Sequence, residues 1–438
     1  MKNSLAYHLT GLLTVATALS ATGGNWPQWR GPHFNGSADD KDLPSTWSKE
    51  SALWTVDLPG PSAATPVVWG NRVFVSTPDE NSKTLHAVCI DRATGKKLWT
   101  NKVGDGIQRD DKSNFAAPSP VADADRVFFF YSNGTLVAFD HSGKELWSRS
   151  ITKDYGDFAF QWTFSSTPLL YDSKLYLQVL QRNVPVRGRG RSDGPSESFF
   201  LAIDPATGKT LWRQIRASEA VKESLEAYST PIPFEYHGRK EILIAGGDCL
   251  TGHDPETGKE LWRWATWNPG KIDHWRLVPS PVTGGGVVLA CAPKRDPVYA
   301  IKAGGNGVLN DSAVVWKSDQ KREVSADVPT PLFYDGDFFV LNDGRENISR
   351  VDPATGNVKW TVELPGRKFE ASPTGADGKL YLMNFGADVV VIDAAKGGIL
   401  GTIAMGDEGD DQTRSSIAVA NGQLFIRTNH KLYCIARK

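Results

Sequence analysis

A proline that follows Ser or Thr recurs along this chain, and the same pattern comes after each occurrence. Successive prolines are separated by as few as 42 residues (Pro331 to Pro373) and as many as 63 (Pro168 to Pro231). Each is followed by a turn signal and an apolar triplet, which is typical of a strand inside a sheet. The prolines are Pro66, Pro120, Pro168, Pro231, Pro281, Pro331 and Pro373. Reuse of one small unit at this period predicts a repeat architecture rather than separate domains.

An eighth unit ends the chain, although it lacks the proline. Residues 421–426 ("NGQLFI") repeat the turn and the triplet, and Ile417 stands at the proline position. The triplets of the other seven units are residues 73–75, 127–129, 175–177, 242–244, 287–289, 338–340 and 380–382.

Most units finish with a tight turn between two strands, as in "CIDRATGKKLWT" from Cys89 and "AIDPATGKTLWR" from Ala202. An Asp opens the turn and can cap it, while a Gly supplies the positive φ of a bulged hairpin. The turn residues are Asp91, Asp204, Asp254 and Asp352, with Gly95, Gly208, Gly258 and Gly356. The strand after the turn carries Trp99, Trp147, Trp212, Trp262, Trp316 or Trp360, whereas unit seven has Leu400 and Gly401. We expect four antiparallel strands per unit, with these tryptophans buried between neighbouring units.

The last unit is one strand short at its end, and a matching strand precedes the first unit. The segment "SALWTVDLPG" (residues 51–60) carries Trp54 at the position of the other tryptophans. Pairing it with the last unit closes the ring and covers exposed strand edges. The sequence therefore predicts an all-β fold, an eight-bladed β-propeller over residues 51–438 with an N-terminal strand closing the last blade, after an arm at residues 23–50.

The chain begins with features of a secretory signal. Lys2 precedes an apolar run from Leu9 to Leu19, and Ala18 and Ser20 are spaced as in a cleavage site. We therefore expect a signal peptide at about residues 1–22 and a periplasmic or secreted protein. The run is too short for a transmembrane segment, and no later stretch is apolar enough for one. A lipid anchor is disfavoured because no cysteine lies near the cleavage region.

The charge balance and the cysteine pattern limit which classes of partner the chain is expected to bind. With 49 basic and 50 acidic residues the chain lacks the cationic surplus of nucleic-acid binders. Cys89, Cys249, Cys291 and Cys434 have neither metal-binding spacing nor the density of a disulfide scaffold, so we expect buried core residues. The sequence does not decide whether a disulfide joins Cys249 and Cys291. The prediction is a monomer with an unknown protein or glycan partner and no nucleic acid.

The repeated pattern, (Ser/Thr)-Pro, Asp/Asn-Gly, an apolar triplet and "A-I-D-x-x-T-G-K-x-L-W", resembles the pyrroloquinoline-quinone (PQQ) repeat. That family includes quinoprotein dehydrogenases and the propeller of the outer-membrane barrel assembly machinery. The resemblance covers about residues 51–438, and "NWPQWRGP" (residues 25–32) resembles the start of many exported bacterial propellers. Quinoprotein dehydrogenases carry two adjacent bridged cysteines, a calcium site of carboxylate and amide oxygens, and an aspartate base. No adjacent cysteines occur here, so PQQ with Ca²⁺ has only the general repeat in its favour.

The residues just before each proline should line the mouth of the central channel, where propellers hold ligands. Aromatic rings there could stack on a planar group, and cations could bind carboxylates. The alternative is a water-filled mouth whose charges hold loops together, and we assign no catalytic residue. The candidate ligand-binding residues are Asn114, Gln161, Trp162, Tyr228, His274, Trp275, Arg276, Asp327, Lys368, Glu370 and Arg414.

Three other segments stand out. Residues 182–198 form an insertion rich in Gly, Arg and Ser, typical of a mobile loop. The acidic loop at residues 406–411 is a weak match to a calcium loop because its oxygen ligands do not alternate. Trp26 and Trp29 are expected to pack the N-terminal arm against the ring, with carbohydrate stacking as the alternative.

These sequence features leave two hypotheses for the function. The preferred hypothesis is an exported, non-catalytic binding or assembly scaffold. The alternative is a PQQ-dependent dehydrogenase of an alcohol or sugar. The missing cysteine pair and the single long insertion favour the first hypothesis.

Overall fold

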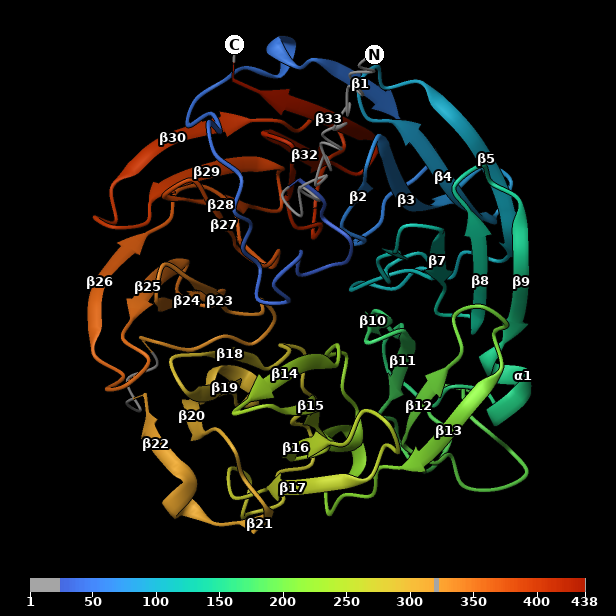
Figure 1. Cartoon of the computed structure of the whole chain (residues 1–438), viewed down its shortest axis with the longest axis vertical. Coiled ribbons are helices and arrows are strands. Elements are labelled where there is room, and N and C mark those ends of the chain that lie inside the picture. The colour runs from blue at the N-terminus through green and yellow to red at the C-terminus, as the bar shows by residue number, and fades with distance from the viewer. Residues whose placement is uncertain (1–23, 319–322, 438) are drawn as a thin grey trace, which may run out of the picture.

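The computed structural model describes residues 24–318 and 323–437, which form eight sheets arranged around a central axis (Figure 1). The expected signal peptide lies outside the described residues. In blades 1 to 7 the strands follow one another outward from the axis in chain order, whereas the outermost strand of blade 8 comes from the start of the chain. All neighbouring strands are antiparallel except β21 (Gly307–Leu309), which joins the outer edge of the fourth blade in parallel. The eight-bladed propeller predicted from the repeats is confirmed.

Blade 1 consists of β2 (Val67–Trp69), β3 (Arg72–Asp79), β4 (Thr84–Asp91) and β5 (Lys97–Asp105), and blade 2 of β6 (Val121–Ala122), β7 (Arg126–Phe130), β8 (Thr135–Asp140) and β9 (Glu145–Ser150). Blade 3 consists of β10 (Leu169–Tyr171), β11 (Lys174–Val179), β12 (Phe199–Ile203) and β13 (Thr210–Ile215). Blade 4 consists of β14 (Ile232–Tyr236), β15 (Arg239–Gly246), β16 (Cys249–His253), β17 (Glu260–Trp264) and β21 (Gly307–Leu309).

Blade 5 consists of β18 (Val282–Gly284), β19 (Val287–Cys291), β20 (Val298–Lys302) and β22 (Val314–Lys317), and blade 6 of β23 (Leu332–Tyr334), β24 (Asp337–Asn342), β25 (Asn347–Val351) and β26 (Val358–Glu363). Blade 7 consists of β27 (Thr374–Ala376), β28 (Lys379–Met383), β29 (Asp388–Asp393) and β30 (Ile399–Ala404). Blade 8 consists of β31 (Ala418–Ala420), β32 (Gln423–Arg427), β33 (Lys431–Ala436) and β1 (Trp54–Asp57). The short helix α1 (Ile151–Tyr155) follows β9, and single 3₁₀ turns occur at Lys49–Ser51, Lys222–Leu225, Pro293–Arg295 and Asp311–Ala313. No helix in the described residues is long and apolar enough to cross a membrane.

The ring is closed by β1, as predicted. It pairs antiparallel with β33, with Trp54 opposite Cys434 and Asp57 opposite Lys431. Trp54 and Val56 are buried while Thr55 and Asp57 are exposed, so one face of the strand joins the core. The two ends of the propeller are therefore held together within one blade.

The Ser/Thr-Pro signal marks the axis of the ring. Each proline directly precedes an innermost strand, the edge of its sheet, where a missing N–H breaks no ladder hydrogen bond. In six of the seven cases the backbone N–H of the preceding Ser or Thr donates to the hydroxyl of its counterpart in the next blade. Six such hydrogen bonds of 2.8–3.1 Å connect Thr65, Ser119, Thr167, Thr230, Ser280, Thr330 and Ser372. The repeated dipeptide thus links blades 1 to 7 around the channel.

The repeated Trp and Gly contact each other across blade boundaries. Gly258 at the turn of blade 4 has φ +72°, and a Cβ there would lie 2.5 Å from the ring of Trp212 in blade 3. The same contact joins Trp54 to Gly95, Trp99 to Gly143, Trp147 to Gly208, Trp316 to Gly356 and Trp360 to Gly397. Several indoles also donate to a carbonyl of the next blade, such as Trp316 to Pro353 O at 2.8 Å. The glycine is therefore required by the neighbouring indole as well as by its own φ.

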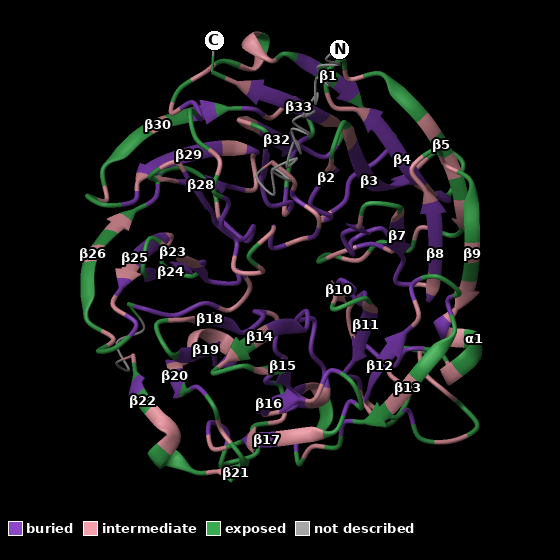
Figure 2. Ribbon diagram, viewed as in Figure 1, coloured by how far each residue is buried: buried purple, intermediate pink, exposed green. Residues whose placement is uncertain are grey.

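The tryptophans are less uniformly buried than the repeat predicted. Trp54, Trp262 and Trp316 are buried. By contrast Trp99, Trp147, Trp212 and Trp360, at equivalent positions, are only partly buried. Figure 2 shows these outer strands, such as β5, β9, β26 and β30, as largely exposed around buried inner strands.

Replacing the turn glycine tests this contact. We expect Gly258→Ala to lower the free energy of unfolding by about 1–3 kcal/mol more than Gly238→Ala, a range typical of overpacking. Both glycines belong to blade 4 and have similar φ (+72° and +78°), but Gly238 faces open space. The positive-φ cost of about 1–2 kcal/mol is therefore common to both variants. The comparison is made by denaturant unfolding with unchanged m-values. Equal losses would show that the indole contact has no energetic role.

The N-terminal arm, dark blue in Figure 1, lies against the inner ends of several blades near the axis. Trp26 is fully buried and bridges to Val68 of β2, and Ser37 bridges to Gly375 of β27. Between them the buried Arg30 donates to the carbonyls of Pro331 and Pro373 at 2.9 and 3.2 Å. Burial lowers the pKa of Arg30 to about 9, so it stays charged at neutral pH. The expectation that Trp26 packs the arm on the ring agrees with this contact.

All four cysteines are buried and free. There is accordingly no link between Cys249 and Cys291. Cys89 and Cys434 are fully buried in equivalent strands, as expected for small core residues. The buried Cys291 and Cys249 lie in β19 and β16 of different blades.

Candidate functional site

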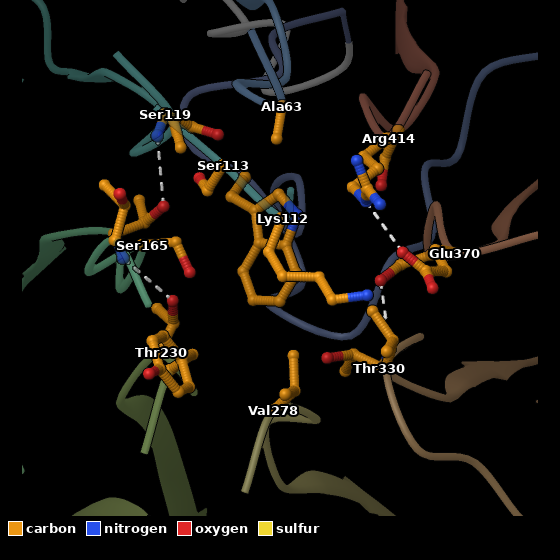
Figure 3. A pocket seen from close by; sticks show the side chains of 18 of the residues that line it. Ala63, Lys112, Ser113, Ser119, Ser165, Thr230, Val278, Thr330, Glu370 and Arg414 are labelled. Atoms are coloured by element: carbon orange, nitrogen blue, oxygen red, sulfur yellow. Dashed lines mark hydrogen bonds and ion pairs between the residues drawn. The ribbon is translucent and has the colours of Figure 1, made fainter. Parts of the chain in front are cut away.

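A cavity of about 150 Å³ lies at the centre of the ring, and we call it the axial pocket (Figure 3). Every segment that leads into an innermost strand contributes a side chain, and Trp29 comes from the arm. Its lining residues are Trp29, Ala63, Lys112, Ser113, Ala117, Ser119, Trp162, Thr163, Ser165, Thr167, Tyr228, Thr230, Arg276, Val278, Val328, Thr330, Glu370, Ser372, Arg414 and Ser416. The propeller thus brings residues far apart in sequence to one site.

Five of the eleven candidates line this pocket: Trp162, Tyr228, Arg276, Glu370 and Arg414. The other six do not. Lys368 lies behind Glu370 and binds its Oε1 at 2.5 Å, and Gln161 accepts from Arg182. His274 is mostly exposed beside Asp273. Trp275 is buried, and its backbone N–H donates to the Ser224 hydroxyl.

Asn114 and Asp327 hold loops. The Asn114 side chain donates to Pro61 O at 2.7 Å and accepts from the N–H of Ala116. The Asp327 carboxylate accepts from the N–H of Lys294 at 2.8 Å. A position before the proline was therefore too broad a criterion, because the irregular backbone of these segments turns only some of their side chains toward the axis.

Glu370 is neutralised by two cations. Its Oε2 accepts from Arg414 at 2.7 Å while Oε1 accepts from Lys368 (Figure 3 shows the Arg414 pair). Burial would raise the pKa of Glu370, but Arg414 and Lys368 outweigh it and hold the pKa below its usual value. Glu370 is therefore ionised and already fully paired, so it has little capacity to act as a base.

Arg276 has an unused donor. Its side chain is only 11% exposed, and its nearest carboxylate oxygen, Glu223 Oε1, is 3.9 Å from Nε. Its buried Nη1 has no hydrogen-bond partner among the described residues. A buried guanidinium N–H without an acceptor is costly, and an anion in the pocket would satisfy it.

The Ser and Thr hydroxyls that link the blades around the channel, which we call the ring hydroxyls, add further donors. Ser119, Thr167, Thr230, Thr330 and Ser372 line the pocket, and each oxygen accepts from a backbone N–H of the preceding blade. A hydroxyl that accepts such a bond keeps its own hydrogen to donate. None of these five donates to another described residue. The wall therefore offers several donors and, apart from the hydroxyls, the single carboxylate of Glu370.

A buried carboxylate lies behind the pocket. Glu226 is paired with Arg182 and accepts from Tyr228 Oη at 2.7 Å and the N–H of Gln161 at 3.0 Å. Burial raises the pKa of Glu226 and of Tyr228. Their mutual hydrogen bond turns the phenol of Tyr228 toward Glu226, which fixes the ring that faces the pocket.

Fifteen of the twenty lining residues were not among the candidates, and Trp29, Lys112 and Thr163 are examples. Trp29 was assigned to the arm, and nothing in its surroundings indicates that the arm reaches the axis. Lys112 and Thr163 belong to the same pre-proline segments as Asn114 and Trp162. Their place in these segments is the one sequence feature that could have identified them as pocket residues. Thr163 is held by Asp110, which accepts from its N–H and its hydroxyl at 2.6 and 2.8 Å. Figure 3 shows Lys112 in the middle of the ring of lining side chains.

The residues do not fit a calcium-bound quinone of the kind that quinoprotein dehydrogenases carry. No group of three or more His, Cys, Asp or Glu side chains suited to a metal occurs in the described part of the chain. In the acidic loop, Asp407 is paired with Lys49 and Lys431, while Asp410 accepts from the N–H groups of Asp407 and Asn429. These carboxylates hold the loop itself, which removes the support for a calcium loop.

Comparisons place the chain among known propellers. It is 23% identical over 397 residues to polyvinylalcohol dehydrogenase from Sphingopyxis sp. (strain 113P3), covering 81% of this chain and 54% of that protein, so the chain spans about half of that relative's length. A europium-containing methanol dehydrogenase has the same fold (TM-score 0.68, 11% identity, 94% of this chain and 98% of that chain). So does BamB from Moraxella catarrhalis (TM-score 0.59, 13% identity, 87% and 98%).

The family model described as outer membrane protein assembly factor BamB matches residues 38–184 and 298–438, more than half of the chain. Together with the eight blades and the repeated Ser/Thr-Pro and Trp signals, this match shows that the chain belongs to the PQQ-repeat β-propeller family.

Proposed function

We propose that this chain is an exported, non-catalytic binding propeller that holds a compact, oxygen-rich anion in its axial pocket. The observation that carries the proposal is the excess of donors over acceptors in the pocket wall. The Nη1 of Arg276 and five ring hydroxyls have hydrogens to donate, and Lys112 forms no ion pair with a described residue. Carboxylate, sulfate and phosphate oxygens are acceptors that match such a wall.

A binding role fits the pocket better than a catalytic one. General acid–base catalysis needs a group whose pKa lies near the working pH. Glu370, the acidic side chain of the described lining, is held ionised by Arg414 and Lys368. His274 lies away from the pocket and is well exposed. Export is supported by the charged and apolar residues at the start of the chain, which lie outside the described residues.

A PQQ-dependent dehydrogenase is the second candidate. Two indoles, Trp29 and Trp162, face the axial pocket and could stack on a planar ring, and the cations could bind its carboxylates. Relatives with the names of dehydrogenases have the same fold. Against it stand the paired state of Glu370 and the absence of an adjacent cysteine pair anywhere in the sequence.

Binding measurements test both candidates. We expect citrate, sulfate or PQQ to bind to the purified protein in calorimetric titration, and Arg276→Ala to weaken binding at least tenfold, since a charge-assisted hydrogen bond contributes about 1.5–3 kcal/mol. Arg191→Ala is the matched control because Arg191 is paired with Asp193 and does not line the axial pocket. The melting temperature of Arg276→Ala should stay close to that of the parent.

The outcomes separate the candidates. Equal affinities for parent and Arg276→Ala would contradict an anion site at this residue. Calcium-dependent PQQ binding together with dye-linked oxidation of an alcohol or sugar would instead establish the dehydrogenase.

A further inference from the structure

A second cavity adjoins the axial pocket between blades 2 and 3, and we call it the side cleft. Its volume is about 230 Å³, and Trp162 and Thr163 line both cavities. The indole of Trp162 therefore forms a shared wall. A ligand that fills the axial pocket with one end can extend past Trp162 into the side cleft.

The side cleft differs chemically from the axial pocket. Phe115 and Trp162 present partly exposed rings, whereas Gln108 and Asp157 are exposed and bind no other described side chain. Amide and carboxylate groups beside aromatic faces provide both donors and acceptors around an apolar platform. A sugar ring has complementary chemistry, because its C–H face carries partial positive charge that stacks on a π face while its hydroxyls both donate and accept.

The insertion in blade 3 builds one wall of this cleft. Residues 182–198 connect β11 and β12, and Gly188 and Arg189 of this loop line the cleft. The guanidinium carbon of Arg187 lies 4.8 Å from the centre of the Trp162 ring. Arg189 donates to Gln161 O at 2.8 Å, which ties the loop to the segment that carries Trp162. The loop expected to be mobile is thus attached at the shared wall and orients the indole.

We propose that the axial pocket and the side cleft form one two-part site for an acidic oligosaccharide of at least two units. The anionic unit, carrying a carboxylate or a sulfate ester, lies in the axial pocket against Arg276 and the ring hydroxyls. A neighbouring unit displaces the exposed Arg187 side chain from the Trp162 ring, stacks there in the side cleft and hydrogen-bonds with Gln108. This proposal rests on the proposed function, because the anionic unit uses the same donors.

A set of related saccharides tests the two-part site on the intact protein. The probes are galacturonate, digalacturonate, lactose and sulfated lactose, titrated by calorimetry and by tryptophan fluorescence. Digalacturonate is expected to bind about tenfold more tightly than galacturonate, the gain expected from one aromatic stacking contact. Lactose, which lacks an anionic group, is expected to bind at least tenfold more weakly than sulfated lactose. Either acidic disaccharide satisfies the proposal, and their ratio identifies the anionic group.

Variants separate the two parts. Trp162→Ala and Gln108→Ala should reduce the advantage of digalacturonate over galacturonate, while Trp162→Phe should keep most of it. Gln214→Ala is the matched control for Gln108, because Gln214 lies on β13 and donates to Thr257 O. Gln108 is exposed, so its variant should fold like the parent and keep the test valid even if Trp162→Ala is unstable.

Three results would overturn the inference. One is equal affinity for galacturonate and digalacturonate, and another is an advantage that survives both Gln108→Ala and Trp162→Ala. The third is binding of citrate, sulfate, PQQ or an acidic peptide that depends on Arg276, with no binding of any acidic saccharide. In the third case the proposed anion site stands and only the saccharide assignment fails, whereas no binding of any anion would overturn both.

Discussion

Deleting residues 51–60 is expected to prevent formation of a stable propeller. The deletion removes β1, whose four residues pair with β33, and exposes the edge of that strand. It also removes Trp54, which packs against Gly95 of blade 1 and donates to Arg92 O at 2.8 Å. Blade 8 would then lose its outermost strand and its indole contact with blade 1. Circular dichroism and thermal melting should show loss of cooperative unfolding.

A second variant keeps the chain length and the connection to the arm. Replacing Trp54 and Val56 together by Asp places charges on the buried face of β1 and should have the same outcome. The control replaces the exposed Thr55 by Ser and Asp57 by Asn and should melt like the parent. Native sheet content and a melting temperature within a few degrees of the parent in the deletion variant would show that β1 is not needed for closure.

Trp262→Ala is expected to lower the free energy of unfolding by about 3–5 kcal/mol, the range for a large buried aromatic side chain. Trp262 is 2% exposed, and its Nε1 donates to Glu241 Oε2 at 2.6 Å. Glu241 is fully buried and its other oxygen is paired with Arg239, so the variant leaves a buried carboxylate oxygen without its indole donor. The measurement is denaturant unfolding with a constant m-value.

Trp212→Ala is the matched control. Trp212 holds the equivalent position one blade earlier, but it is partly exposed and its Nε1 has no partner among the described residues. We therefore expect a clearly smaller loss, and acrylamide should quench Trp212 more readily than Trp262. Equal losses in the two variants would mean that the blade contact, and not burial with Glu241, accounts for the effect.

Local signals in the sequence predicted most of the architecture. The Ser/Thr-Pro dipeptides, the Asp and Gly turns and the apolar triplets each depend on backbone conformation or on alternation within a strand, so they can be read without knowing the neighbours in space. The short last unit and the Trp54 strand together predicted how the ring closes. The contact between each Trp and the Gly of the next blade was not predicted, because it joins side chains from different units.

The candidate site was predicted only in part. Trp162, Tyr228, Arg276, Glu370 and Arg414 were placed at the channel mouth because the repeat indicates which segments reach the axis. Trp275 and Lys368 belong to the same segments, but neither lines the axial pocket. Which residues of a segment face inward depends on the irregular backbone before each innermost strand, and no repeat pattern specifies that backbone.

The sequence by itself determined the number of blades, the strand order within each blade and which segments reach the axis, because these follow from short-range turn and strand preferences repeated eight times. Only the tertiary structure decided that Trp29 of the arm reaches the axial pocket, that Glu370 is neutralised by two cations and that Arg276 keeps a free donor. The physical reason is that these properties depend on distances between segments from different blades and from the arm. Closure of the ring sets those distances, and they have no counterpart in local sequence.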